Sequence, residues 1–204
     1  MVKEIFVSLL TPYTADEALK NSLWVEIEQA YSGKERHYHN LSHLQNVYDQ
    51  LLPVKKAVKS WETILFTLFY HDVVYNALAT DNEQQSAHFA EERLERIGVP
   101  KTRILDCKTQ ILATRQHLEN ADPDTNYFTD ADLSILGQAA HIYEAYRRNV
   151  RKEYAVYPDS VYNPGRKKVL KHFLQMKQIF KTPYFQTHFE SNAKENLTAE
   201  FNSL

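Results

Sequence analysis

Along most of the chain, apolar residues recur every three or four positions, which is the spacing of one face of an α-helix. Segments that alternate apolar and polar residues, the pattern of a half-buried strand, do not occur at useful length. The sequence therefore predicts an all-α fold, built as one bundle of about eight to nine helices. The predicted helices are Ala15–Ser32, Leu41–Leu52, Ser60–Tyr70, Asp81–Gly98, Lys101–His117, Thr129–Gly137 after a polar loop at Glu119–Asn126, Gln138–Tyr154, one that starts at Asn163-Pro164 and one that starts at Thr182-Pro183.

The most apolar of these segments ends in two residues that carry chemistry. Residues 64–70 are apolar on nearly all sides, as expected of a helix at the centre of a bundle, and His71 and Asp72 follow directly. An unpaired carboxylate at this place is costly to desolvate, and a bound cation is the simplest compensation. The alternative is an aspartate that caps or salt-bridges the helix end, with the histidine packed beside it.

A second group of candidate residues surrounds the predicted start of the helix Leu41–Leu52. His39 and His43 are four residues apart there, so both rings can face one cavity. One of them can bind a metal ion while the other works beside it. The alternative is a pair of surface histidines on a solvated first turn.

A third candidate follows the polar loop. Asp130 is placed to cap the short helix that comes next, whereas Asp132 lies one turn in, among apolar neighbours. Asp132 can join His43, His71 and Asp72 in a set of two imidazoles and two carboxylates. Such a set suits a six-coordinate Mn, Fe, Co, Ni or Mg ion with waters in the shell, and it suits structural zinc poorly. We expect one or two such divalent ions.

Composition and charge narrow the classes of function. The chain of 204 residues has four glycines, too few for a Gly-rich nucleotide-binding loop of the Walker or Rossmann kind. Its formal net charge of -2 gives no global basic field, so nucleic acid is not favoured as a partner. No apolar run approaches the length that spans a bilayer, so no membrane partner is expected.

Cysteine content and the first residues bear on location. Cys107 is the only cysteine, which excludes an internal disulfide framework and a thiolate zinc site and fits a reducing compartment. The apolar stretch Met1–Leu10 is too short for a signal h-region followed by small cleavage residues. We therefore expect a cytoplasmic protein. Because the sequence contains no repeat or composition break, we also expect residues 1–204 to form a single domain.

The order of these motifs resembles the HD superfamily of metal-dependent phosphohydrolases, which are all-helical. His43, the pair His71-Asp72 and Asp132 in its Ala-Asp-Leu context carry the resemblance, which covers about residues 36–137. The whole chain is similar to a bacterial subgroup of predicted HD phosphohydrolases through Tyr38–His43, Asp81–Glu83, Thr114–His117, Asp130–Gly137 and Pro164–Arg166. The helices of residues 138–204 are then expected to pack on the metal-site core, as a pocket wall or as the face of a homodimer.

The spacing of Tyr38-His39-Asn40 and His43 is also similar to the signature of cyclic nucleotide phosphodiesterases, a distant branch of that superfamily. In that branch the earlier histidine protonates the leaving oxygen and the later one binds metal, which implies His39 as the general acid and His43 as a ligand. Cyclic nucleotide specificity is not implied, because this chain is shorter than those catalytic domains and shows no sign of their purine pocket.

The resemblance implies a hydrolase that cleaves a phosphorylated small molecule, a phosphate ester or a nucleotide, by metal-activated water. We assign Glu83 as a second catalytic residue, an acid/base group or a water orienter, with a solvated first-turn residue as its alternative. Candidates for binding the oxyanions of the substrate are residues beside a motif or at a helix start: Arg36, Arg115, His117 and Arg166. The alternative for each arginine is a plain surface side chain. His117, like Asp81 and Glu83, is also a spare donor, with the alternatives of a metal ligand, a partner of a ligand or neither.

The sequence is also compatible with two other functions. Some HD proteins use a di-iron centre for oxidation, and iron retention with oxygen-dependent turnover would mark such an oxygenase. A regulatory binding module would keep the fold and the metal without turnover, and tight ligand binding without product would mark it.

Overall fold

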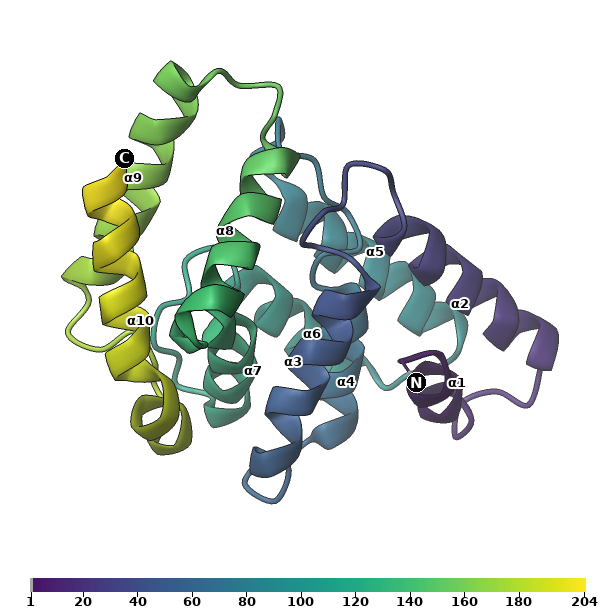
Figure 1. Ribbon diagram of the computed structural model, residues 1–204. Helices are drawn as coiled ribbons and strands as arrows, with labels where there is room; N and C mark the ends of the chain where they lie inside the picture. Colours follow the sequence, from purple (N-terminus) through teal and green to yellow (C-terminus); the bar gives the residue numbers. More distant parts are fainter. Residues whose placement is uncertain (1) are drawn as a thin grey trace. The chain divides into compact units, whose positions relative to one another are not determined.

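The protein is all-helical, as the sequence predicts. A computed structural model describes residues 2–204, and within this range there are ten α-helices, two short 3-10 helices and no strand (Figure 1). This is slightly more than the eight to nine helices expected. The α-helices are α1 Val2–Leu10, α2 Glu17–Tyr31, α3 Leu41–Leu51, α4 Trp61–Tyr70, α5 Asn82–Arg96, α6 Lys101–Ala113, α7 Pro123–Leu133, α8 Ala140–Glu153, α9 Asp159–Gln175 and α10 Pro183–Ser203. The 3-10 helices are η1 Leu52–Val54 and η2 Ser134–Gly137.

The chain divides into two compact units, and the division falls within α7, between Thr129 and Asp130. The first unit holds α1 to α6 and the start of α7. The second holds the end of α7, η2 and α8 to α10. The single domain expected from the sequence stays a prediction. None of the helices within residues 2–204 has both the length and the apolar character needed to cross a membrane.

α4 is the central helix of the first unit. Its residues Thr63–Tyr70 are all buried, and the helix contacts α1, α3, α5 and α6. The Phe6 ring of α1, a helix that the sequence analysis did not predict, packs edge-on against Phe69 with ring centroids 4.8 Å apart. Because α4 is apolar on nearly all sides, other helices must cover it. Its C-terminal end therefore delivers His71 into the interior.

The start of α7 differs from the sequence prediction. Residues 119–126 were expected to form a loop and Thr129–Gly137 a helix, yet α7 already begins at Pro123. Asp122 explains the earlier start, because its carboxylate accepts hydrogen bonds from the main-chain N–H and the hydroxyl of Thr125, at 3.0 and 2.8 Å. Proline is also favoured in the first turn of a helix.

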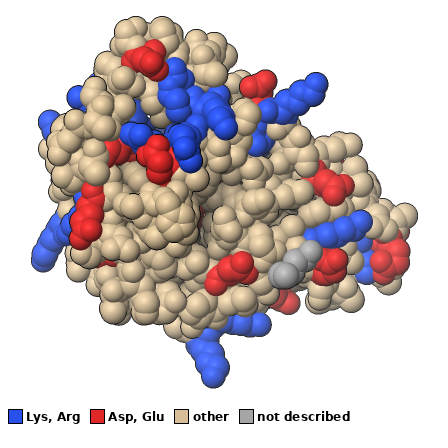
Figure 2. Space-filling model, viewed as in Figure 1, with Lys and Arg blue, Asp and Glu red and all other residues tan. Residues whose placement is uncertain are grey.

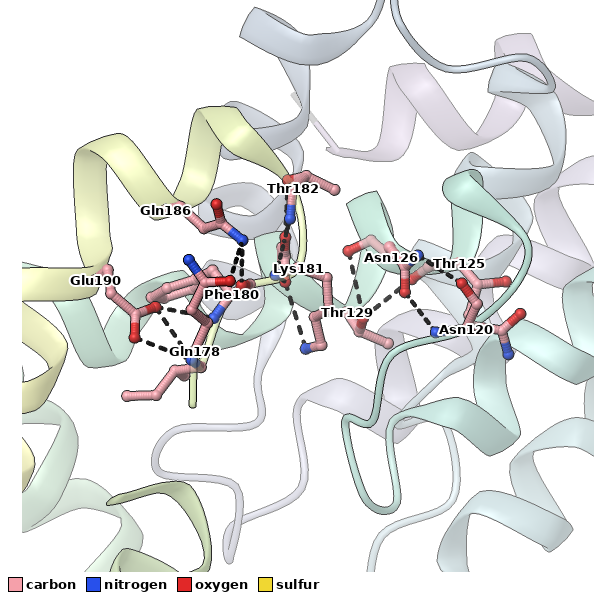
Figure 3. Close-up of polar contacts among 12 residues, drawn as sticks. Asn120, Thr125, Asn126, Thr129, Gln178, Phe180, Lys181, Thr182, Gln186 and Glu190 are labelled. Atoms are coloured by element: carbon pink, nitrogen blue, oxygen red, sulfur yellow. Dashed lines mark hydrogen bonds and ion pairs between the residues drawn. The ribbon is translucent and has the colours of Figure 1, made fainter. Parts of the chain in front are cut away.

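Asp130 anchors the start of α10 and does not cap the helix that carries it. Its carboxylate accepts hydrogen bonds from the main-chain N–H of Lys181 at 3.0 Å, and from the N–H and hydroxyl of Thr182 at 2.7 Å. The Glu190 carboxylate likewise accepts hydrogen bonds from the main-chain N–H groups of residues 179–180 (Figure 3). The capping role predicted for Asp130 is therefore wrong, because an N-cap residue lies at the start of a helix and Asp130 lies inside α7.

In the second unit, η2 packs closely against α10. The side-chain amide of Asn196 donates to the main-chain oxygens of residues 136 and 138 at 2.9 Å, and that of Asn192 donates to Gly137 O at 3.2 Å. A Cβ atom at Gly137 would overlap the main chain of Phe189. Glycine is therefore required at this contact.

Gly137→Ala is expected to lower the free energy of unfolding by about 1–3 kcal/mol, the usual cost of overpacking a tight contact. Urea unfolding of the full chain, followed by far-UV circular dichroism, measures the change. Gly165→Ala is the matched control, because a Cβ there meets nothing within 4 Å inside α9. It should stabilise the helix by about 0.5–1 kcal/mol. A Gly137→Ala protein as stable as the wild type would contradict the close approach.

Charged side chains of both signs are mixed on the surface of the second unit. On the face drawn in Figure 2, Lys and Arg side chains gather over α8 and α9, with acidic side chains among them. Arg147 pairs with Glu144 at 2.9 Å, and Arg151 pairs with Asp159 at 2.8 Å. This local pairing adds no support for nucleic acid as a partner.

Candidate metal centre

His43 lies in the first turn of α3, the place that the sequence predicts. Asn40 is the N-cap residue, and its side-chain oxygen accepts hydrogen bonds from the main-chain N–H groups of Ser42 and His43, at 2.9 and 3.3 Å. The cap fixes where the helix begins and therefore where the His43 ring points. The side chain of His43 is 2% exposed.

His71 and Asp72 lie at the C-terminal end of α4. The main-chain N–H of His71 donates to Thr67 O at 2.9 Å, so the helix still holds this residue. Its ring nitrogen Nδ1 lies 2.9 Å from Leu68 O, an oxygen that only accepts hydrogen bonds. Nδ1 therefore carries a proton, and Nε2 of the neutral ring presents its lone pair on the other side.

Three side chains of the first unit converge on one point. His43 Nε2 lies 3.1 Å from His71 Nε2, and Asp72 Oδ2 lies 3.2 Å from His71 Nε2 and 3.8 Å from His43 Nε2. Both histidines are buried, and the Asp72 side chain is 19% exposed. Nitrogen and oxygen lone pairs held this close are stabilised by a proton or a cation between them. The arrangement is therefore chemically suited to hold a metal ion.

Arg36 joins the two segments that carry these side chains. One terminal nitrogen of its guanidinium donates to the main-chain oxygens of His39 and Asp72, at 3.1 and 2.7 Å. The other terminal nitrogen donates to the main-chain oxygen of Val73, the residue after Asp72, at 3.1 Å. The rings of Tyr31 and Tyr75 each lie 5.1 Å from the guanidinium carbon. These contacts give the guanidinium a structural role inside the protein, while the substrate-binding role expected of Arg36 stays a prediction.

His39 lies beside this cluster, half-buried and just ahead of the N-cap of α3. Its ring stacks on the Tyr75 ring, with centroids 4.2 Å apart and planes at 30°. The centroids of the His39 and His43 rings are 5.8 Å apart. The two rings are therefore neighbours, while the assignment of His39 as the general acid stays a prediction.

Three other candidates of the first unit lie at helix ends. Glu83 is half-buried in the first turn of α5, the position that its alternative role requires. Arg115 is exposed after α6, and His117 follows with a φ of 53°. A left-handed backbone is uncommon for a residue with a side chain, and here the His117 N–H closes a turn by donating to Ala113 O at 3.0 Å. The roles of these three residues stay predictions.

The second unit carries the last two candidates. Asp132 is half-buried in the last turn of α7. Arg166 of α9 forms a two-point ion pair with Glu200 of α10, at 2.8 and 2.9 Å, and the two side chains are 8% and 1% exposed. This pair gives Arg166 a structural role, while the substrate-binding role expected of it stays a prediction.

The roles of Asn40, Tyr75 and Lys181 are not predicted by the sequence patterns above. Asn40 offered a signal, because asparagine is favoured as an N-cap. The Lys181 side chain is 5% exposed, its Nζ lies 3.3 Å from Asp130 Oδ1, and burial lowers the pKa of its amine. Nothing in the sequence marks this lysine, which lies in a loop where lysine is normally solvated. Tyr75 likewise lies in an irregular segment, where no periodicity shows which way a side chain points.

Comparison of this chain with protein-family models, with curated proteins and with solved structures gives no match. The resemblance to the HD superfamily therefore stays a prediction, based on the motifs quoted above. To those motifs the structure adds the all-helical fold and the close approach of His43, His71 and Asp72.

Proposed function

We propose that the protein is a metal-dependent phosphohydrolase of the HD type, which cleaves a phosphate ester or a nucleotide with water as the nucleophile. The observation that carries the proposal is the convergence of His43 Nε2, His71 Nε2 and Asp72 Oδ2, with no distance between them above 3.8 Å. Imidazole and carboxylate ligands suit Mn, Fe, Co, Ni or Mg, and the proposal includes one or two such ions.

Asp132 is the fourth ligand in this proposal. It lies four residues after Phe128 in α7, so the two side chains lie on one face of the helix. The Phe128 ring packs edge-on against the His71 ring, with centroids 5.3 Å apart. We propose Asp132 as the second carboxylate of the ligand set, as the order of the motifs implies.

The residues of the chain would divide the work between ligation and proton transfer. A metal ion at these ligands would supply a water of lowered pKa and would polarise a phosphoryl oxygen. The hydrogen bond from His71 Nδ1 to Leu68 O holds the ring and its tautomer, as partners behind metal ligands commonly do. His39 would give its proton to the leaving oxygen, with its ring held by Tyr75.

A cytoplasmic location and a small-molecule substrate belong to the same proposal. Cys107 is fully buried in α6, and burial raises the pKa of its thiol to about 12. The thiol is therefore protonated and unreactive at neutral pH, which fits a protein that needs no oxidising compartment. A homodimer stays a prediction.

Elemental analysis of the full chain, purified without chelator, tests the proposal. We expect at least one bound divalent ion, and hydrolysis of a member of a phosphate-ester and nucleotide panel when Mn, Co, Ni or Mg is supplied. Bound iron with oxygen-dependent turnover and no hydrolysis would favour the oxygenase instead. A ligand bound tightly without product would favour the regulatory module, and a chain that retains none of these ions would contradict the proposal.

A further inference from the structure

The Tyr75 ring is a shared support for two residues of the candidate centre. It lies in the loop after α4, with the Arg36 guanidinium 5.1 Å and the His39 ring 4.2 Å from its centroid. On α2, Tyr31 also contacts the guanidinium, and its hydroxyl accepts a hydrogen bond from the Asp72 N–H at 3.1 Å. The main chain at His39 and the main chain at Asp72 are therefore held by one group of residues, namely Tyr31, Arg36 and Tyr75.

His39 needs such support because it lies outside the regular part of α3. It precedes the N-cap residue Asn40, where no hydrogen bond of the helix restrains the chain. Arg36 holds its main-chain oxygen and Tyr75 holds its ring. The same guanidinium holds the main-chain oxygen of Asp72, so one side chain fixes both segments.

We infer that Arg36 and Tyr75 are positioning residues, which set where the His39 ring lies relative to His43 and Asp72 and which touch no substrate. The inference rests on the proposed function, in which His39 protonates the leaving oxygen. A proton donor must lie within hydrogen-bonding reach of the leaving atom, and a displacement of about 1 Å can lower the rate about 100-fold.

Two substitutions of Tyr75 separate the stacking of its ring from any contribution of its hydroxyl. Tyr75→Leu should lower kcat about 10- to 100-fold with unchanged KM and metal content, because the His39 ring loses its support. Tyr75→Phe keeps the ring and should retain most of kcat. Arg93→Met is the matched control for substitution of Arg36, since the Arg93 guanidinium also lies over an aromatic ring, 3.7 Å from the centre of Phe89, and its ion pair is with Glu26 at 2.8 Å. It should leave kcat at the wild-type value.

Arg36→Met tests the second half of the inference. The affinity for Mn²⁺ should fall about 10- to 100-fold, the usual effect of removing a residue that orients metal ligands. Titration of the chelator-treated full chain with Mn²⁺ alone measures this affinity.

Thermal unfolding shows whether each variant is folded. If Tyr75→Leu does not fold, Tyr75→Met takes its place in the kinetic measurements.

A spectroscopic measurement tests the inference without turnover. In NMR, the Cε1 proton of His39 should shift towards its position in an unstructured peptide in Tyr75→Leu, because the stacked ring no longer shields it. If no substrate of the panel is hydrolysed, the proposed function fails. The NMR shift and the Mn²⁺ titration still show whether Arg36 and Tyr75 hold the residues of the centre in place. An unchanged kcat or an unmoved resonance in Tyr75→Leu would overturn the inference. So would a raised KM with normal Mn²⁺ affinity in Arg36→Met, which would return Arg36 to substrate binding.

Discussion

His43→Ala is expected to abolish metal binding while the helical content stays near that of the wild type. The substitution removes one of the two buried imidazoles of the proposed centre. Of the four proposed ligands it leaves one imidazole, that of His71, and the carboxylates of Asp72 and Asp132, a set that we expect to be too weak to retain the ion through purification. α3 itself does not depend on the ring, because the Asn40 side chain caps the main chain at the start of the helix. Elemental analysis and far-UV circular dichroism of the purified variant measure the two outcomes.

Two companion variants separate the roles within the centre. Asp132→Ala should also lose the metal, since it removes the proposed fourth ligand. His39→Ala should keep the metal and lose turnover, by about 100- to 10,000-fold if the residue is the general acid. If His39→Ala releases the metal instead, the roles of His39 and His43 have been assigned the wrong way round.

His88→Ala is the matched control for these histidine variants. His88 is 71% exposed on α5, and it pairs only at the surface, with Glu91 at 3.7 Å and Glu92 at 3.4 Å. Its removal should change neither the metal content nor the turnover. A loss of metal in His88→Ala equal to that in His43→Ala would show that the effect is not specific to the centre. A His43→Ala protein that keeps its metal would remove His43 from the ligand set.

The helices α2 to α5 and α8 could be predicted from the sequence to within two residues at each end, whereas α6, expected to reach His117, ends at Ala113. The central helix was expected over Ser60–Tyr70 and spans Trp61–Tyr70, because its apolar residues leave little ambiguity. The start of a helix whose first turn is polar is harder to predict from the sequence. α9 begins at Asp159, while the prediction began at Asn163-Pro164 because proline prefers the first turn; Pro164 instead lies inside the helix.

The candidate site was predictable only in part, for a related reason. His71 and Asp72 are neighbours in sequence, so the end of one apolar helix was enough to single them out. His43 is 28 residues from His71, and only the order of motifs suggested that the two rings meet. The partner of Arg166 is Glu200, 34 residues further on, and no local pattern predicts such a pair. Long-range partners follow from tertiary packing, which periodicity does not encode.

Arg166→Met is expected to lower the free energy of unfolding by about 3–5 kcal/mol, the cost of leaving a buried charge without its partner. The Glu200 carboxylate is 1% exposed, so water cannot replace the two hydrogen bonds from the guanidinium. The hydroxyl of Tyr143 donates to the same carboxylate and would be its remaining partner. Urea unfolding of the full chain, followed by far-UV circular dichroism, measures the loss.

Two further variants test the structural role of this ion pair. The double variant Arg166→Met/Glu200→Leu should lose less stability than Arg166→Met, because it leaves no unpaired carboxylate in the interior. Arg147→Met is the surface control, since Arg147 also makes two contacts with one carboxylate, that of Glu144, at 2.9 and 3.1 Å, and the Glu144 side chain is 42% exposed. Exposed pairs of this kind contribute about 0–1 kcal/mol. Equal losses in Arg166→Met and Arg147→Met would contradict a structural role for the buried pair. A raised KM at unchanged stability would support substrate binding by Arg166.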